Sequence, residues 1–182
     1  MGFMAQGGTL TYRDLLEFPD DGKRREIIDG ELFVSAAPYL RHQRLVGRLF
    51  MSFASHLEAH GGGAVYFAPA DVVLSDINVV EPDLLFVADD QRDIETEANI
   101  QGVPALVVEV VSNPRMDRIR KRDLYARFGV PEYWIVDPDA DRIEVYRHDA
   151  AGYPKPQISE PGEMLTYERL PGLSIDLAAL FA

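Results

Sequence analysis

The sequence predicts a single α/β domain over residues 1–182, with a mixed central sheet flanked by helices and with added antiparallel β-hairpins. The length of 182 residues is typical of one domain, and no linker rich in serine, glycine or proline divides the chain. A strand, a helix and a strand follow one another between residues 105 and 138, the pattern of a crossover between parallel strands. An Asp-Gly pair between two apolar runs predicts a hairpin.

The first third of the chain predicts a short helix, a hairpin and a long helix. Residues 9–18 form the short helix, with Thr11 as its N-cap. Asp29-Gly30 supplies the positive φ angles that a type I′ hairpin turn requires. Residues 41–60 form the long helix, whose apolar side chains recur every four residues and which stops at three glycines. Its apolar stripe comprises Leu45, Leu49, Phe53 and Leu57.

The rest of the chain predicts strands around one further helix. Residues 64–76 and 79–90 are rich in β-branched and aromatic side chains and predict two strands. Residues 105–111 and 131–138 predict two more, both strongly apolar. The C-terminal part predicts meandering strands and a terminal helix.

The helix between residues 114 and 128 has the clearest boundaries in the chain. Asn113 can cap its N-terminus, and Pro114 suits the first helical position because that residue needs no N–H donor. Gly129 ends the helix, and Pro131 prevents its continuation.

Composition excludes several classes of protein. The chain has no cysteine, which removes disulfides, thiolate metal sites and cysteine nucleophiles. No apolar run approaches the roughly 20 residues of a membrane span, and no signal peptide is recognisable, so we expect a cytoplasmic protein. A net charge of -12 argues against a protein that coats nucleic acid non-specifically. No phosphate-binding glycine loop or serine-hydrolase elbow is present.

Residues 115–127 nevertheless form a basic segment. They hold six Arg and Lys side chains against two Asp, a local charge of +4 in an acidic protein. Two interpretations stay open with about equal weight, namely a surface that faces anions and a helix face whose arginines are solvated or salt-bridged.

Glu109 is the most unusual residue of the predicted strands, because it lies within the aliphatic run ALVVEVV. A buried carboxylate is costly unless it is paired or binds a metal. Asp83, which follows Pro82, begins a strand that can neighbour the strand of Glu109. Two carboxylates on adjacent strands form a hard oxygen site suited to Mg²⁺ or Mn²⁺, with a backbone carbonyl and waters completing the shell.

Lys121 is predicted to point toward the same site. On a 3.6-residue wheel, Lys121 and Asp117 continue the apolar stripe of Leu124, Tyr125 and Phe128 toward the helix N-terminus. That end of the helix lies near the C-terminal end of the preceding strand, where open α/β sheets commonly place their sites. The alternatives are a buried salt bridge between Lys121 and Glu109 and a helical pair between Lys121 and Asp117.

Several of these segments, in order, resemble one family. EPDLLFV, VVEVVS and KRDLYARFGVPEYWIVDP, together with REIIDGELFVSAAPYLRHQR nearer the N-terminus, are similar to the Uma family of putative restriction endonucleases, within the PD-(D/E)xK nuclease superfamily. The resemblance covers about residues 10–150. It implies a restriction-endonuclease-like fold.

The resemblance also implies roles for individual residues. Asp83 and Glu109 would bind the metal, and Glu26 matches an additional acidic position. The superfamily lysine normally stands two residues after the glutamate, where this chain has Val111. Lys121 resembles a migrated substitute that reaches the site from the helix.

The resulting expectation is a Mg²⁺- or Mn²⁺-dependent endonuclease that hydrolyses phosphodiester bonds of nucleic acid, with DNA favoured as the substrate. Lys121 would position the attacking water or stabilise phosphoryl charge. His42, Arg118 and Arg122 are candidate contacts to substrate phosphates, although a histidine at the position of His42 is more often a surface residue. We expect a homodimer, because double-strand cleavage needs two sites. The alternative is a catalytically inactive nuclease fold that serves as a nucleic-acid-binding or protein-assembly module.

Overall fold

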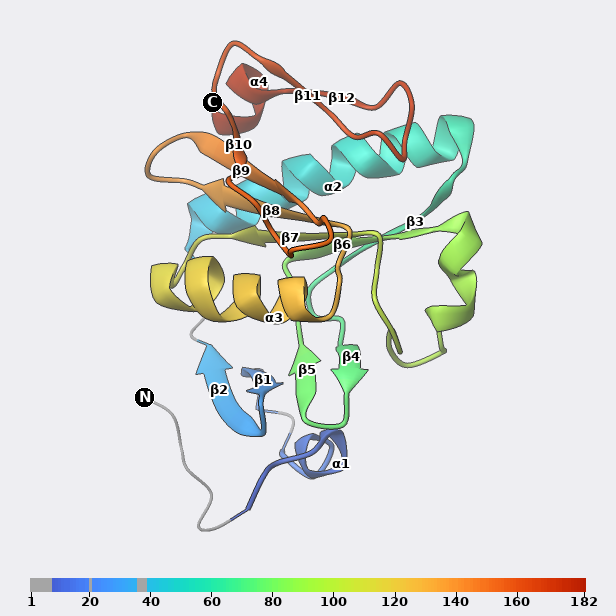
Figure 1. Cartoon of the computed structure of the whole chain (residues 1–182). Helices are drawn as coiled ribbons and strands as arrows, with labels where there is room; N and C mark the ends of the chain where they lie inside the picture. The colour runs from blue at the N-terminus through green and yellow to red at the C-terminus, as the bar shows by residue number, and fades with distance from the viewer. Residues whose placement is uncertain (1–7, 20, 36–38) are drawn as a thin grey trace.

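The fold is described by a computed structural model for residues 8–19, 21–35 and 39–182. A six-stranded sheet forms the centre, with α2 (Leu40–His60) on one face and α3 (Arg122–Arg127) on the other (Figure 1). The short α1 (Tyr12–Leu15) lies beside a smaller sheet below, and α4 (Leu177–Phe181) lies above α2. These layers confirm the predicted mixed α/β fold.

The central sheet is mixed. Its order is β10-β9-β8-β7-β6-β3, and within it only β7 and β8 pair in parallel. Because the segment containing α3 connects these two strands, the predicted strand–helix–strand crossover is confirmed. The strands are β3 (Gly63–Phe67), β6 (Leu84–Ala88), β7 (Leu106–Val110), β8 (Glu132–Asp137), β9 (Arg142–Arg147) and β10 (Gln157–Ser159).

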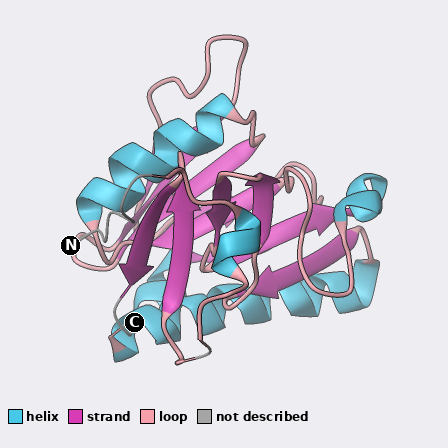
Figure 2. Cartoon of the chain, turned by 90° about the horizontal axis from the view of Figure 1, so that it is seen from below, coloured by secondary structure: helices cyan, strands magenta, loops and turns pink. Residues whose placement is uncertain are grey.

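A second, four-stranded sheet has the order β2-β1-β5-β4, and its strands lie across those of the central sheet (Figure 2). Its strands are β1 (Arg24–Ile28), β2 (Glu31–Ser35), β4 (Val72–Ser75) and β5 (Asn78–Val80). The predicted hairpin is β1-β2, and Asp29 and Gly30 have φ angles of 52° and 77°. This sheet carries Arg24 and Glu26 toward the central sheet.

The prediction for residues 64–76 and 79–90 was wrong in number, because these two runs form four strands. Pro69 separates β3 from β4, and Pro82 separates β5 from β6. Proline has no N–H to donate to a ladder, so each run breaks there and its halves pair in different sheets. Asp83 therefore stands at the point where the chain passes from one sheet to the other.

Two hydrophobic cores lie on opposite faces of the central sheet. The α2 stripe of Leu45, Leu49 and Phe53 is buried against one face, as predicted. Leu124 and Tyr125 of α3 belong to the core on the other face. The C-terminal segment closes the first core with β11 (Met164–Thr166), β12 (Ser174–Asp176) and α4, which confirms the predicted strands and terminal helix. Within the described residues, no helix combines the length and apolarity that a membrane crossing requires.

Candidate functional site

The candidate site lies where β6 and β7 meet the second sheet. These strands pair antiparallel with Leu84 opposite Val108, so Asp83 and Glu109 follow as the next facing positions. The N–H of Val110 donates to Asp83 Oδ2 at 2.9 Å, which fixes the aspartate against the end of β7. Both carboxylates are buried. The predicted neighbouring strands of Asp83 and Glu109 are thus confirmed.

The helical segment after β7 delivers Lys121. Asn113 Oδ1 accepts from the N–H of Met116 at 3.3 Å, so the predicted cap is present. The expected regular helix is instead widened into a π-helical turn, η2 (Met116–Lys121), before α3 begins. Asp117 contributes to this geometry, because its carboxylate turns back and accepts from the N–H groups of Ser112 and Asn113 at 3.2 and 3.1 Å. Such turns occur frequently at functional sites.

Lys121 joins two carboxylates that come from different sheets. Its Nζ lies 2.8 Å from Glu109 Oε1 on β7 and 2.8 Å from Glu26 Oε1 on β1. The lysine is only 3% exposed. The hydroxyl of Tyr125, one turn later, donates to the same Glu109 oxygen at 3.0 Å. The predicted inward direction of Lys121 is confirmed, and the proposed buried salt bridge to Glu109 is present.

Both carboxylate oxygens of Asp83 contact charged or polar groups of the protein. Arg24 donates to its Oδ1 at 2.8 Å, and His42 Nε2 lies 2.9 Å from its Oδ2. Burial alone would raise the pKa of Asp83, but the His42 hydrogen bond and the charges of His42, Arg24 and Lys121 lower that pKa to about 2. Asp83 is therefore a carboxylate at neutral pH.

The pKa of Glu109 is shifted in the opposite direction, above its usual value. Complete burial raises its pKa to about 8, because the nearby charges of Asp83, Glu26 and Asp117 oppose the attraction of Lys121. Burial would lower the pKa of Lys121, but its carboxylate neighbours raise it instead. The site therefore contains a permanently charged ammonium and more carboxylates than its cations neutralise.

Three residues of the site, Arg24, Glu81 and Tyr125, were not predicted. Arg24 stands two residues before the predicted Glu26 on β1 and so faces the same side of the strand, but that signal identifies no partner. Glu81 precedes Asp83 by two residues. Its N–H donates to Glu26 Oε1 at 2.9 Å, and burial raises the pKa of its carboxyl. Tyr125 was predicted only as part of the apolar stripe, although its hydroxyl binds Glu109.

The donor chemistry fits a hard divalent cation. Asp83 and Glu109 offer carboxylate oxygens from facing positions, which is the ligand type that Mg²⁺ and Mn²⁺ prefer. Among the described residues, no group of three or more His, Cys, Asp and Glu side chains is arranged to hold a metal ion. A metal here would therefore rely on these two carboxylates with backbone oxygen and water, as expected from the sequence.

The candidate phosphate contacts are divided between two places. His42 joins the site and is buried, so its alternative assignment as a surface residue was wrong. Arg118 instead forms ion pairs with Asp137 and Glu144 on β8 and β9. Arg122 pairs with its neighbour Asp123 at 2.7 Å. Neither of these two arginines contacts Asp83 or Glu109 in the part of the chain that the structure describes, and their predicted role stays a prediction.

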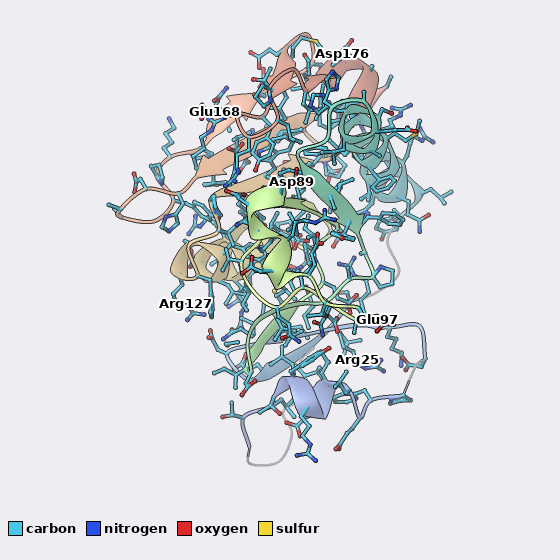
Figure 3. All side chains as sticks on the ribbon, turned by 90° about the vertical axis from the view of Figure 1, so that its right-hand side faces the viewer. Arg25, Asp89, Glu97, Arg127, Glu168 and Asp176 are labelled. Carbon is cyan, nitrogen blue, oxygen red and sulfur yellow. The ribbon has the colours of Figure 1, made fainter. Side chains whose placement is uncertain are left out.

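Other arginines of the basic segment 115–127 are also paired. Arg120 lies 2.9 Å from Glu31, and Arg127, which projects outward from α3, lies 2.8 Å from Asp29 (Figure 3). The structure thus favours the second of the two interpretations of this segment. These exposed pairs stabilise the fold little, but they reduce the positive charge that the segment presents.

A pocket of about 640 Å³ opens beside Asp83. Its lining includes the polar side chains of Arg24, His42 and Asp83 and the apolar side chains of Val46, Phe50 and Phe67. We call this space the Phe67 pocket. Asp83 lines this pocket, whereas Glu109, Lys121 and Glu26 are buried and are not part of its lining.

Comparison with known proteins supports the resemblance seen in the sequence. Residues 12–178 match the model of the Uma2 family, described as putative restriction endonuclease. No curated protein matches the chain. The fold is similar to the crystal structure of a putative nuclease of the group DUF820 from Anabaena variabilis, with a TM-score of 0.79 and 17% identity. That alignment covers 94% of this chain and 97% of the other.

Proposed function

Because the chain belongs to the Uma2 family of putative restriction endonucleases, we propose that it is a Mg²⁺-dependent nuclease that hydrolyses phosphodiester bonds, with DNA favoured as the substrate. The observation that carries this proposal is the position of Lys121. It reaches Glu109 from a helix, at 2.8 Å, beside the facing Asp83. A hydrolytic site requires such a convergence of charged side chains, and Asp83 lines an open pocket while Glu109 and Lys121 are buried beside it.

Asp83 and Glu109 would hold the metal ion. When bound, Mg²⁺ or Mn²⁺ would polarise the substrate phosphate and lower the pKa of a bound water. The low pKa of Asp83 supports this assignment, because that side chain presents a negative charge without first losing a proton. Burial, and then the neighbouring carboxylates, raise the pKa of Glu109 despite the ammonium of Lys121, so a bound cation would further favour its ionised form.

Lys121 would act as a fixed positive charge. Its raised pKa keeps the ammonium protonated at neutral pH, so it cannot take a proton from water. An ammonium in this position instead stabilises negative charge that develops on the phosphoryl oxygens as water adds to phosphorus and the ester bond breaks. Glu26, at 2.8 Å from Nζ, would hold the lysine in place.

The direction of Lys121 separates this proposal from the rival function. A non-catalytic binding or assembly module has no need for a lysine aimed at two buried carboxylates, and breaking such a pair is costly for the fold. The buried salt bridge accounts for Lys121 and Glu109. It does not account for the pocket that opens at Asp83.

The test is cleavage of labelled DNA, single-stranded and duplex, in Mg²⁺ and in EDTA. Asp83→Asn, Glu109→Gln and Lys121→Met should each reduce the rate by at least about 100-fold, as expected when one preorganised charge is removed. Glu144→Gln is the matched control, because Glu144 is a buried carboxylate of the same sheet that pairs with Arg118. Cleavage that persists in EDTA, or that the three site variants retain, would contradict the proposal.

A further inference from the structure

The Phe67 pocket has a chemistry that metal binding and hydrolysis alone do not explain. Its volume of about 640 Å³ lies within the range of small-ligand sites, roughly 300–1,000 Å³. Its lining combines the charged and polar side chains of Arg24, His42 and Asp83 with aliphatic and aromatic side chains. A scissile phosphate at Asp83 would place the attached nucleotide within reach of those apolar side chains.

Phe67 is fixed in position relative to Asp83. Phe67, at the end of β3, is paired with Leu84 of β6. The N–H of Ala68 then donates to the main-chain carbonyl of Asp83 at 3.2 Å. The aromatic wall is therefore set by the same strand pairing that sets the carboxylate, and the two keep a constant separation.

Phe67 also presents an unusual amount of apolar surface. Its side chain is 50% exposed, and its ring meets Phe50 of α2 edge-on, with the ring centroids 4.7 Å apart. Gly47, in the same pocket, leaves open space where a side chain would begin. A half-exposed phenyl ring that lines a pocket provides the kind of surface on which nucleobases stack.

His42 supplies a second, independent sign of a ligand. The side chain lines the pocket and is only 6% exposed, and its Nε2 contacts Asp83. Within the described parts of the chain, its Nδ1 is buried without a hydrogen-bond partner. Unsatisfied buried nitrogens are rare in folded proteins, so this nitrogen on a pocket-lining residue is available to a partner from outside the chain, either a water molecule or a ligand atom.

The charge distribution argues against tight binding to duplex phosphates. The chain carries a net charge of -12, and the arginines of the basic segment 115–127 described above are paired with acids. A protein that binds a duplex tightly usually does so through a basic surface that contacts many phosphates. Here stacking would have to supply much of the affinity.

We propose that the Phe67 pocket holds an unstacked nucleobase next to the scissile phosphate, so that the substrate is single-stranded nucleic acid or an unpaired nucleotide within a duplex. This inference rests on the proposed nuclease function and specifies its substrate class. A base inside an intact duplex is already stacked on both faces, and extracting it costs a few kcal/mol. A base in a single strand reaches Phe67 without that cost.

The experiment measures binding of a fluorescent 12-nucleotide oligo-dT, alone and paired with oligo-dA, in EDTA and low salt. The wild type should bind the single strand at least about tenfold more tightly than the duplex, and Phe67→Leu should weaken single-strand binding about tenfold, the effect of losing one base–aromatic stack. Phe67→Trp keeps an aromatic face and should stay within about threefold of wild type. Met164→Ala, which alters a side chain that is 56% exposed on β11, is the matched control.

Three results would overturn the inference: equal or tighter binding of the duplex, unchanged binding by Phe67→Leu, or no binding of the single strand at micromolar concentrations. Thermal unfolding of each variant checks that a loss of binding does not come from a loss of fold. Failure of the nuclease proposal looks different. In that case the single strand is bound through Phe67, but Mg²⁺ produces no cleavage that depends on Asp83.

Discussion

Lys121 Nζ lies 2.8 Å from Glu109 Oε1, although the lysine belongs to a π-helical turn and the glutamate to a strand twelve residues earlier. The position two residues after Glu109, on the strand side, is occupied by Val111. A positive charge therefore reaches the carboxylates from across the strand–helix connection. The proposed hydrolysis would need a positive charge at that point in space, and the helix provides one.

Replacing Lys121 with Met should destabilise the fold in a pH-dependent way. The variant leaves Glu26 and Glu109 buried without their cation, which costs about 3–5 kcal/mol when they are ionised. Burial already raises the pKa of Glu109 from 4.5 to about 8. A carboxyl with a folded pKa above its unfolded value reduces stability as pH rises between the two values, and below both the reduction is absent.

Urea unfolding of wild type and Lys121→Met at pH 5 and pH 8 measures this effect. The loss of unfolding free energy should be clearly larger at pH 8. Lys121→Arg keeps the charge and should show little difference between the two pH values. Equal losses for Lys121→Met at both pH values would show that the ion pair does not control the site.

Asp83→Asn should remove a contribution to stability that wild type loses in acid. The pKa of Asp83 is lowered from 3.8 to about 2, which corresponds to about 2 kcal/mol. A carboxyl with a depressed folded pKa contributes stability above its unfolded pKa, and that contribution disappears as pH falls through the folded value. The stability difference between wild type and Asp83→Asn should therefore shrink from pH 5 to pH 2.5.

Unfolding by urea in EDTA checks this prediction without bound metal. Asp139→Asn, on the exposed turn between β8 and β9, provides the control and should parallel wild type over the same range. A difference between wild type and Asp83→Asn that stays constant with pH would contradict the assigned role of His42 and Arg24.

Tyr125→Phe should weaken both the fold and the chemistry. The hydroxyl donates to Glu109 at 3.0 Å in a buried setting, and such a hydrogen bond stabilises a protein by about 0.5–1.5 kcal/mol when the acceptor is neutral and by about 1.5–3 kcal/mol when it is ionised. Its loss also frees Glu109 to change orientation, so the cleavage rate should fall several-fold. Tyr153→Phe is the comparison, because its hydroxyl donates to the Val130 carbonyl at 2.8 Å and contacts no site carboxylate. That variant should lose stability and keep its cleavage rate.

Local signals predicted the parts of the molecule that depend on neighbouring residues in the chain. Asn113, Pro114 and Gly129 bounded the helical segment, and its apolar stripe pointed Lys121 toward the sheet. Asp83 and Glu109 followed from the order of the strands. Each of these inferences needs only helical or strand periodicity and one crossover connection.

The features that the sequence did not predict depend on contacts between residues that are far apart in the chain. Arg24 reaches Asp83 because β1 pairs with β5 through Ile27 and Val79, and no local pattern encodes that contact. Arg118 forms ion pairs with Asp137 on β8 and Glu144 on β9, so its charge is neutralised within the protein. The π-helical turn depends on Asp117 folding back onto the strand end. Each outcome requires knowing which elements meet.

Calorimetric titration of Mn²⁺ and Mg²⁺ into the metal-free protein tests the central claim most directly, because it requires no knowledge of the substrate. Wild type and the Glu144→Gln control should bind one ion per chain, and Glu109→Ala should lose that binding while remaining folded. Binding that survives in Glu109→Ala would contradict the claim that Asp83 and Glu109 form a metal site. The same conclusion would follow if the wild type bound neither ion with a single-stranded oligonucleotide present to complete the coordination.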